Sequence, residues 1–79
     1  MQYNCKAVGT AIRKIRIKRG LSQEVVSGLA GIARTHLTMI ESGNKQANFE
    51  TIWKIAQAFD MLPSDLVRLI EAEITQDNK

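Results

Sequence analysis

The chain has 79 residues, of which 44% are hydrophobic and 24% charged, and its formal net charge is +3. A chain of this length is expected to fold as one small domain, which leaves no room for a second domain or a deep catalytic cleft. Its single cysteine, Cys5, excludes an internal disulfide, and it has too few cysteine and histidine residues for a structural zinc site.

The first 31 residues predict two helices. Apolar residues at i, i+3, i+4 and i+7 indicate a helix over about residues 7–19 that ends at Gly20. Its buried side is expected to consist of Val8, Ala11, Ile12 and Ile15. A second, shorter helix is expected over about residues 23–30, with Ser22 as its N-cap and Gly31 as its end. Its core face should contain Val25, Val26, Leu29 and Ala30.

Three further helices are predicted after Gly31. The third covers about residues 33–42, where Ala33, Leu37 and Ile40 follow a helical period. Asn48 is expected to cap the fourth, whose buried stripe is Phe49, Ile52, Ile55, Ala56 and Phe59. Pro63 opens the fifth, whose apolar residues are Leu66, Leu69, Ile70 and Ile74. Residues 75–79 are expected to fray, so the sequence predicts a compact all-α, five-helix domain with its core in residues 7–74.

The cations gather in the first half of the chain. Residues 1–34 carry a net charge of +6 and residues 35–79 a net charge of −3. A basic half on a small domain is typical of a protein that binds a polyanion, although a solvated basic surface would have the same composition. No apolar run approaches the roughly 18 residues of a membrane span and no export signal is visible, so a cytoplasmic protein is expected.

The second and third helices, residues 23–42, form the segment with the clearest functional pattern. Two helices joined by so short a turn cross steeply, and the second of them projects from the domain. The major groove of B-DNA is about 12 Å wide and admits one α-helix. An arginine there can pair with guanine, threonine hydroxyls can donate or accept, and apolar groups can contact a thymine methyl. The residues expected to contact bases are Arg34, Thr35, Thr38 and Met39, with His36 beside them.

The stretch LSQEVVSGLAGIARTHLTMIESG, followed by IWKIAQAF and preceded by IRKIRIKRG, resembles the helix-turn-helix domain of the Cro/C1-type repressor family, also called the XRE family. The likeness covers about residues 8–67 and implies a lambda-repressor-like fold that binds double-stranded DNA. By resemblance, Gln23 and the pair Asn44 and Lys45 would contact DNA phosphates, which fixes register without reading sequence. The resemblance also implies a structural ion pair between Arg16 and Glu41.

Members of this family bind DNA as dimers, because one such domain buries too little surface on DNA for useful specificity. The fifth helix offers a surface for a homodimer. If Leu66 and Leu69 face the core, then Val67, Ile70 and Ile74 form a second apolar stripe that a monomer would expose.

Two functions remain open at this point. The first is a sequence-specific transcription regulator, similar to phage repressors or restriction-modification controller proteins, which needs no cofactor or small-molecule ligand. The second is a protein-interaction module, such as an antitoxin that masks a toxin. Catalysis is not expected, since Cys5 and His36 have no third orienting residue or oxyanion motif beside them. Arg34 could also be a solvated arginine, and Met39 could be a packing residue.

Overall fold

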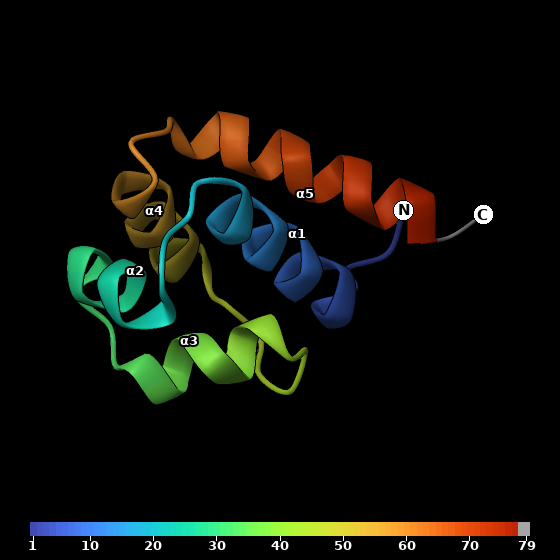
Figure 1. Cartoon of the computed structure of the whole chain (residues 1–79). Helices are drawn as coiled ribbons and strands as arrows, with labels where there is room; N and C mark the ends of the chain where they lie inside the picture. Colours follow the sequence, from blue (N-terminus) through green and yellow to red (C-terminus); the bar gives the residue numbers. More distant parts are fainter. Residues whose placement is uncertain (78–79) are drawn as a thin grey trace.

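The structure is a computed structural model that describes residues 1–77, with Asp77 placed as the last residue of a helix. Within this range the chain forms five helices and no strand, as the sequence predicts. The helices are α1 (Cys5–Lys18), α2 (Gln23–Ala30), α3 (Arg34–Glu41), α4 (Phe49–Ala58) and α5 (Pro63–Asp77) (Figure 1).

Three helices begin at a polar side chain that satisfies a main-chain N–H of the first turn. Ser22 accepts a hydrogen bond from Val25 N at 3.1 Å, and Asn48 accepts one from Thr51 N at 2.8 Å. Both caps were predicted. Asn4 caps α1 in the same way, so this helix begins two residues earlier than the apolar pattern suggested.

The central helix of the fold is α1, which packs between α3 on one side and α5 on the other (Figure 1). α2 packs against α3 and α4, and α4 packs against α5. Gly9 lies where α1 meets the end of α3, and a β-carbon at this position would overlap the main-chain oxygen of Ile40. The two helices therefore approach each other closely only because residue 9 has no side chain.

Several residues expected in the core are exposed. The exposed fractions are 46% for Val25, 63% for Leu29 and 68% for Phe49. Each lies on a helix whose buried side is narrower than its apolar pattern, so the apolar arc extends past the contact with the neighbouring helix. Val26 and Ala30 of α2 are buried as predicted.

The side of α5 that faces the core also differs from the prediction. Leu66 is buried, but Leu69 is 44% exposed, whereas Ile70 and Ile74 are 7% and 4% exposed. The buried stripe therefore follows the i, i+4, i+8 row, which packs against α1 and α4. The expectation that Ile70 and Ile74 form an exposed stripe is wrong.

The ends of the helices need two smaller corrections. α3 begins at Arg34 and ends at Glu41, with Ala33 and Ser42 as its caps rather than its first and last residues. α5 continues through Asp77, so residues 75–77 are helical where a frayed end was expected; the same expectation for residues 78 and 79 lies outside the described part. None of the helices described is both long and apolar enough to cross a membrane.

Candidate nucleic-acid interface

The turn between α2 and α3 depends on one glycine. Gly31 has φ +71°, in the left-handed region that residues with a side chain rarely adopt. The main-chain N–H of Ile32 then donates to Ser27 O at 3.0 Å, which closes the end of α2. The chain reverses within three residues, and α3 lies along one edge of the molecule (Figure 1).

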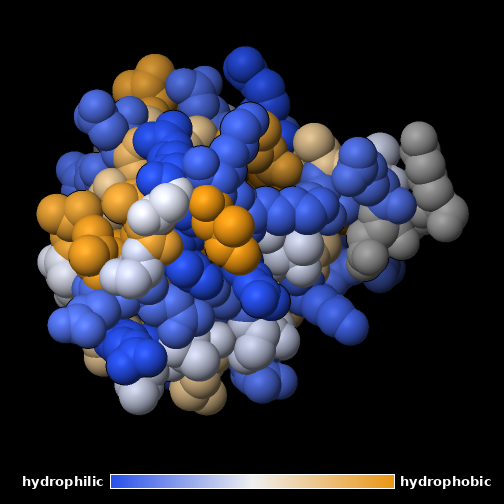
Figure 2. Space-filling model, viewed as in Figure 1, coloured by the Kyte–Doolittle hydropathy of each residue, from blue (hydrophilic) through white to orange (hydrophobic). Residues whose placement is uncertain are grey.

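The two faces of α3 differ in composition. Leu37 and Ile40 are buried at 0% and 1% exposure, and they anchor the helix to the core. Of the five residues expected to contact bases, Arg34, Thr35, Thr38 and Met39 are exposed and His36 is half-buried. In Figure 2, the lower edge of the molecule, where α3 lies, is mostly hydrophilic, whereas apolar side chains gather over α2 at the left.

The expected ion pair between Arg16 and Glu41 is present between α1 and α3. Nε of Arg16 donates to Oε2 of Glu41 at 2.8 Å, and Nη2 donates to Oε1 at 3.0 Å. Nη1 of the same arginine donates to the carbonyl of Leu21 at 2.9 Å. The side chains of Arg16 and Glu41 are 13% and 3% exposed, so the pair is shielded from solvent and fixes α3 relative to α1.

Gln23 extends this network to the outer face of α3. Its Nε2 donates to Oε1 of Glu41 at 3.1 Å, and its Oε1 accepts a hydrogen bond from the Thr38 hydroxyl at 3.0 Å. The family resemblance implies a phosphate contact for Gln23, and this bridge was not predicted. No pattern in the sequence predicts this bridge. Gln23 and Thr38 are 15 residues apart, and the angle at which α2 and α3 cross brings them together.

Gln23 lines two hollows on this surface. One, of about 360 Å³, is lined by Arg16, Ser22, Gln23, Glu24 and Arg34. The other, of about 180 Å³, is lined by Arg13, Arg16, Gln23, Thr38, Glu41 and Ser42. Each contains an exposed arginine, so the start of α2 is flanked by positive charge.

Asn44 and Lys45 lie directly after α3 and are held to it. Their main-chain N–H groups both donate to Met39 O, at 2.9 Å and 3.2 Å. Nδ2 of Asn44 also donates to Oγ of Ser42 at 3.1 Å. Both side chains are exposed at the end of α3 opposite to Arg34, so the two groups of expected phosphate contacts lie at opposite ends of the helix.

A basic residue of α1 and the arginine that directly follows this helix have partners within the protein. Lys14 pairs with Glu73 of α5 at 2.9 Å. Arg19 donates to the main-chain carbonyl of Phe59, and its guanidinium lies 5.9 Å from the centre of the Phe59 ring. The basic composition of the first half of the chain therefore serves the fold in part.

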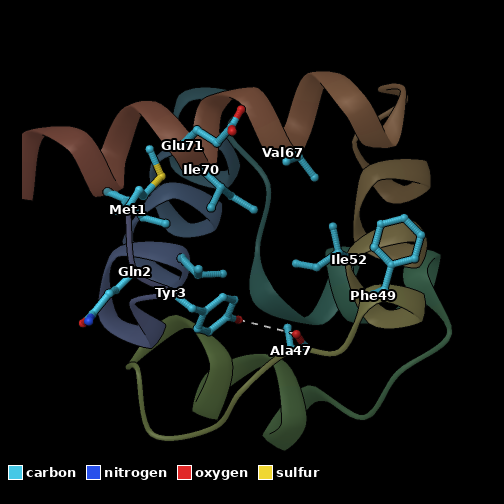
Figure 3. A pocket seen from close by; sticks show the side chains of 11 residues that line it. Met1, Gln2, Tyr3, Ala47, Phe49, Ile52, Val67, Ile70 and Glu71 are labelled. Atoms are coloured by element: carbon cyan, nitrogen blue, oxygen red, sulfur yellow. Dashed lines mark hydrogen bonds between the residues drawn. The ribbon is translucent and has the colours of Figure 1, made fainter.

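A second surface, formed by α4, α5 and the N-terminal segment, is apolar. A groove of about 450 Å³ runs between the N-terminal segment and α5, and Val67, Ile70 and Ile74 line it together with Phe49 and Ile52 (Figure 3). An adjoining hollow of about 650 Å³ is lined by Phe49, Trp53, Leu62, Pro63, Ser64, Val67, Arg68 and Glu71. Phe49 and Trp53 meet edge to face, with ring centres 5.9 Å apart.

The N-terminal segment forms one wall of the first groove. The hydroxyl of Tyr3 donates to Ala47 O at 3.5 Å (Figure 3). Partial burial of the phenol raises the pKa of Tyr3 above its usual value of 10.0, and the neighbouring Cys5 adds to this effect. The hydrogen bond between Tyr3 and Ala47 connects the segment before α1 with the loop before α4.

Comparison with known proteins identifies the family. The helix-turn-helix family HTH_3 matches residues 12–67. The chain belongs to this family. It is an XRE-type helix-turn-helix domain of the kind found in DNA-binding transcription regulators, which are not enzymes.

The relatives include controller proteins of restriction-modification systems. The chain is 33% identical over 60 residues to control protein C.BamHI of Bacillus amyloliquefaciens, covering 75% of this chain and 74% of that protein. It is 31% identical over 62 residues to the HTH-type transcriptional regulator y4dJ of Sinorhizobium fredii, covering 78% and 80% of the two chains.

The solved structures agree with this assignment. The restriction-modification controller protein C.AhdI from Aeromonas hydrophila is 32% identical, with a TM-score of 0.75 over 78% of this chain and 94% of that one. The controller protein C.Esp1396I, a tetramer in complex with its natural 35 base-pair operator, has the same fold, with a TM-score of 0.84 at 20% identity over 95% and 99% of the two chains.

Proposed function

We propose that this protein is a transcription regulator that binds a specific operator as a homodimer, with α3 in the major groove. The observation that carries the proposal is the composition of α3, whose buried face is apolar and whose exposed face carries Arg34, Thr35, Thr38 and Met39. An α-helix with side chains is about 10–12 Å across, which matches a groove about 12 Å wide.

Each proposed contact follows from the chemistry of its side chain. Arg34, at the start of α3, would pair with guanine through its two parallel N–H groups, and Thr35 would bond an adjacent base edge. Met39 and the methyl group of Thr38 would pack on a thymine methyl, and the half-buried His36 would lie beside them.

Phosphate contacts would hold the helix at both of its ends. Gln23 begins α2, whose N-terminal N–H groups and dipole favour an anion, and it lines two hollows that also contain arginines. Asn44 and Lys45 would bind a second phosphate beyond the other end of α3. The controller protein C.Esp1396I, which shares this fold, is a tetramer in its complex with its natural operator, and this supports the same use of the fold here.

The homodimer would form through the apolar surface of α4 and α5. Phe49, Trp53 and Leu62 are 68%, 47% and 66% exposed, and Val67 connects the two hollows that they line. Ile70 and Ile74 would contribute as the floor of the groove rather than as its exposed edge. A second copy fits this surface because Arg68 and Glu71 lie at its edge, and a two-fold axis can bring each against the opposite charge of the partner.

The test is selection from random duplex DNA by the purified protein at about 150 mM salt, where non-specific binding is weak. The expected result is a motif of two related half-sites about 34 Å apart. If no motif is enriched, the exposed face of α3 does not read bases. The alternative of a protein-interaction module would then account better for the apolar surface of α4 and α5.

A further inference from the structure

The hydroxyl group of Thr38 has one hydrogen and two acceptors for it within the protein. Its Oγ1 lies 3.0 Å from Oε1 of Gln23 and 3.0 Å from the main-chain oxygen of Arg34. The second contact is the usual bond from a helical threonine to the carbonyl four residues earlier. Whichever acceptor takes the hydrogen, the hydroxyl donates inward.

The orientation of the Gln23 amide is fixed by the ion pair behind it. Both oxygens of Glu41 accept hydrogen bonds from Arg16, and a carboxylate paired in this way can only accept. The amide group 3.1 Å from Glu41 must therefore be the nitrogen, because an amide oxygen there would face a carboxylate oxygen. The amide oxygen of Gln23 is then directed at Thr38.

Outward donation by Thr38 would have a cost within the protein. If the hydroxyl turned its hydrogen to solvent, neither Oε1 of the half-buried Gln23 nor the main-chain oxygen of Arg34 would receive it. Acceptance through the lone pairs of Oγ1 leaves this hydrogen in place, since a hydroxyl can donate once and accept as well. Thr38 is exposed, so these lone pairs are open to a partner.

We propose that Thr38 reads DNA as a hydrogen-bond acceptor, pairing with the exocyclic amine of adenine (N6) or cytosine (N4) in the major groove. The bases offer only these amines as donors there, while N7, O6 and O4 are all acceptors. The inference rests on the proposed function and adds the chemical class of the atom that Thr38 recognises. Gln23 does not contact the base in this proposal; it is a positioning residue whose amide oxygen keeps the hydrogen of Thr38 directed inward.

The same amide can still bind the DNA backbone. Nε2 of Gln23 has two hydrogens, of which Glu41 takes one. The second is available for a phosphate oxygen. Gln23 can therefore orient Thr38 and contact a phosphate at the same time.

The experiment compares DNA selection by the wild-type protein, Thr38→Val and Thr38→Ser. Valine keeps the branched shape and removes the hydroxyl, whereas serine keeps the hydroxyl and removes the methyl. One base pair is expected to lose its preference in Thr38→Val and keep it in Thr38→Ser. Thermal unfolding checks that both variants fold.

The atom is then identified with modified DNA at that base pair. Removal of the major-groove amine, for example with 2-aminopurine for adenine or 2-pyrimidinone for cytosine, should weaken wild-type binding about three- to ten-fold. It should leave Thr38→Val unchanged. Replacing the purine N7 by carbon, or O4 or O6 by sulfur, should have no such effect.

Loss of wild-type affinity on removal of an acceptor atom, with none on removal of the amine, would overturn the inference. So would an identical motif for wild type and Thr38→Val, although the enriched motif would then leave the proposed function intact. Absence of any enriched motif would refute the proposed function together with this inference. If Thr38→Val does not fold, Thr38→Ala, which also lacks the hydroxyl, takes its place in both experiments.

Discussion

The guanidinium of Arg16 and the carboxylate of Glu41 join α1 to the last residue of α3 through hydrogen bonds of 2.8 Å and 3.0 Å. Because the Glu41 side chain is 3% exposed, its charge depends on this arginine for compensation. The same carboxylate accepts from Gln23, which in turn accepts from Thr38. The pair thus links the interior of the domain to the exposed face of α3.

Removal of the arginine should strongly destabilise the fold. We expect Arg16→Met to lower the free energy of unfolding by about 3 kcal/mol or more, since it leaves a buried carboxylate without its cation. Lys14→Met is the matched control, because Lys14 forms an ion pair of 2.9 Å with Glu73 but is 63% exposed. The control should lose no more than about 1 kcal/mol. Urea unfolding measures the free energy of unfolding of both variants. Equal losses would mean that the shielded ion pair stabilises the fold no more than the exposed one.

The close approach of α1 and α3 should make Gly9 intolerant of even a methyl group. A β-carbon there would lie 2.7 Å from the main-chain oxygen of Glu41 and closer still to that of Ile40. We expect Gly9→Ala to lower the free energy of unfolding by about 2 kcal/mol, because the helices must separate. Gly28→Ala is the control: nothing lies within 4 Å of its β-carbon, so helix propensity should stabilise it by up to about 1 kcal/mol. Destabilisation by both variants would contradict this account.

The existence and order of the helices could be predicted from sequence, but their buried sides could be predicted only in part. In α2, Val25 and Val26 are adjacent residues about 100° apart around the helix, and the apolar pattern includes both. Only Val26 is buried, because α3 and α4 cover one side of α2. Periodicity identifies an apolar arc, whereas the neighbouring helices decide how much of that arc is covered.

The same distinction applies to α5 and to the candidate site. Leu69 and Ile70 are both apolar, so the sequence alone does not show which of them is buried. Ile70 is buried because α5 packs against α1 and α4 on that side. The residues on the exposed face of α3 could be predicted, since that face follows from Leu37 and Ile40 and one helical period. The bridge from Gln23 to Thr38 could not, because it depends on the angle at which two helices cross.

Arg34 should determine the preference for one base pair. We expect Arg34→Lys to keep the charge and the salt dependence of binding but to lose about 1–3 kcal/mol of discrimination at that pair, because lysine lacks the paired N–H groups that guanine requires. Binding to operators altered at each position in turn measures this. If the base preference is instead unchanged at every position, Arg34 does not read a base, and a phosphate contact is the better assignment.

Lys45 should behave in the opposite way. We expect Lys45→Gln to weaken binding to all sequences alike and to reduce the slope of log affinity against log salt by about 0.9, the value for one phosphate. Lys14→Gln is the control, since Lys14 pairs with α5 on the side of α1 away from α3 (Figure 1). Its slope should match the wild type. An unchanged slope for Lys45→Gln would remove this residue from the DNA interface.

The apolar surface of α4 and α5 should hold the homodimer together. Trp53 and Phe49 are exposed, edge to face, and line the larger hollow, so they have the chemistry of interface anchors. We expect Trp53→Ser or Phe49→Ser to weaken self-association at least about 30-fold, which corresponds to about 2 kcal/mol, measured by sedimentation equilibrium. Leu29→Ser is the control, because Leu29 is 63% exposed but lines neither hollow. If only the control dissociates the dimer, the exposed apolar residues of α2 form the interface; if the wild type is monomeric even on DNA, the homodimer itself is wrong.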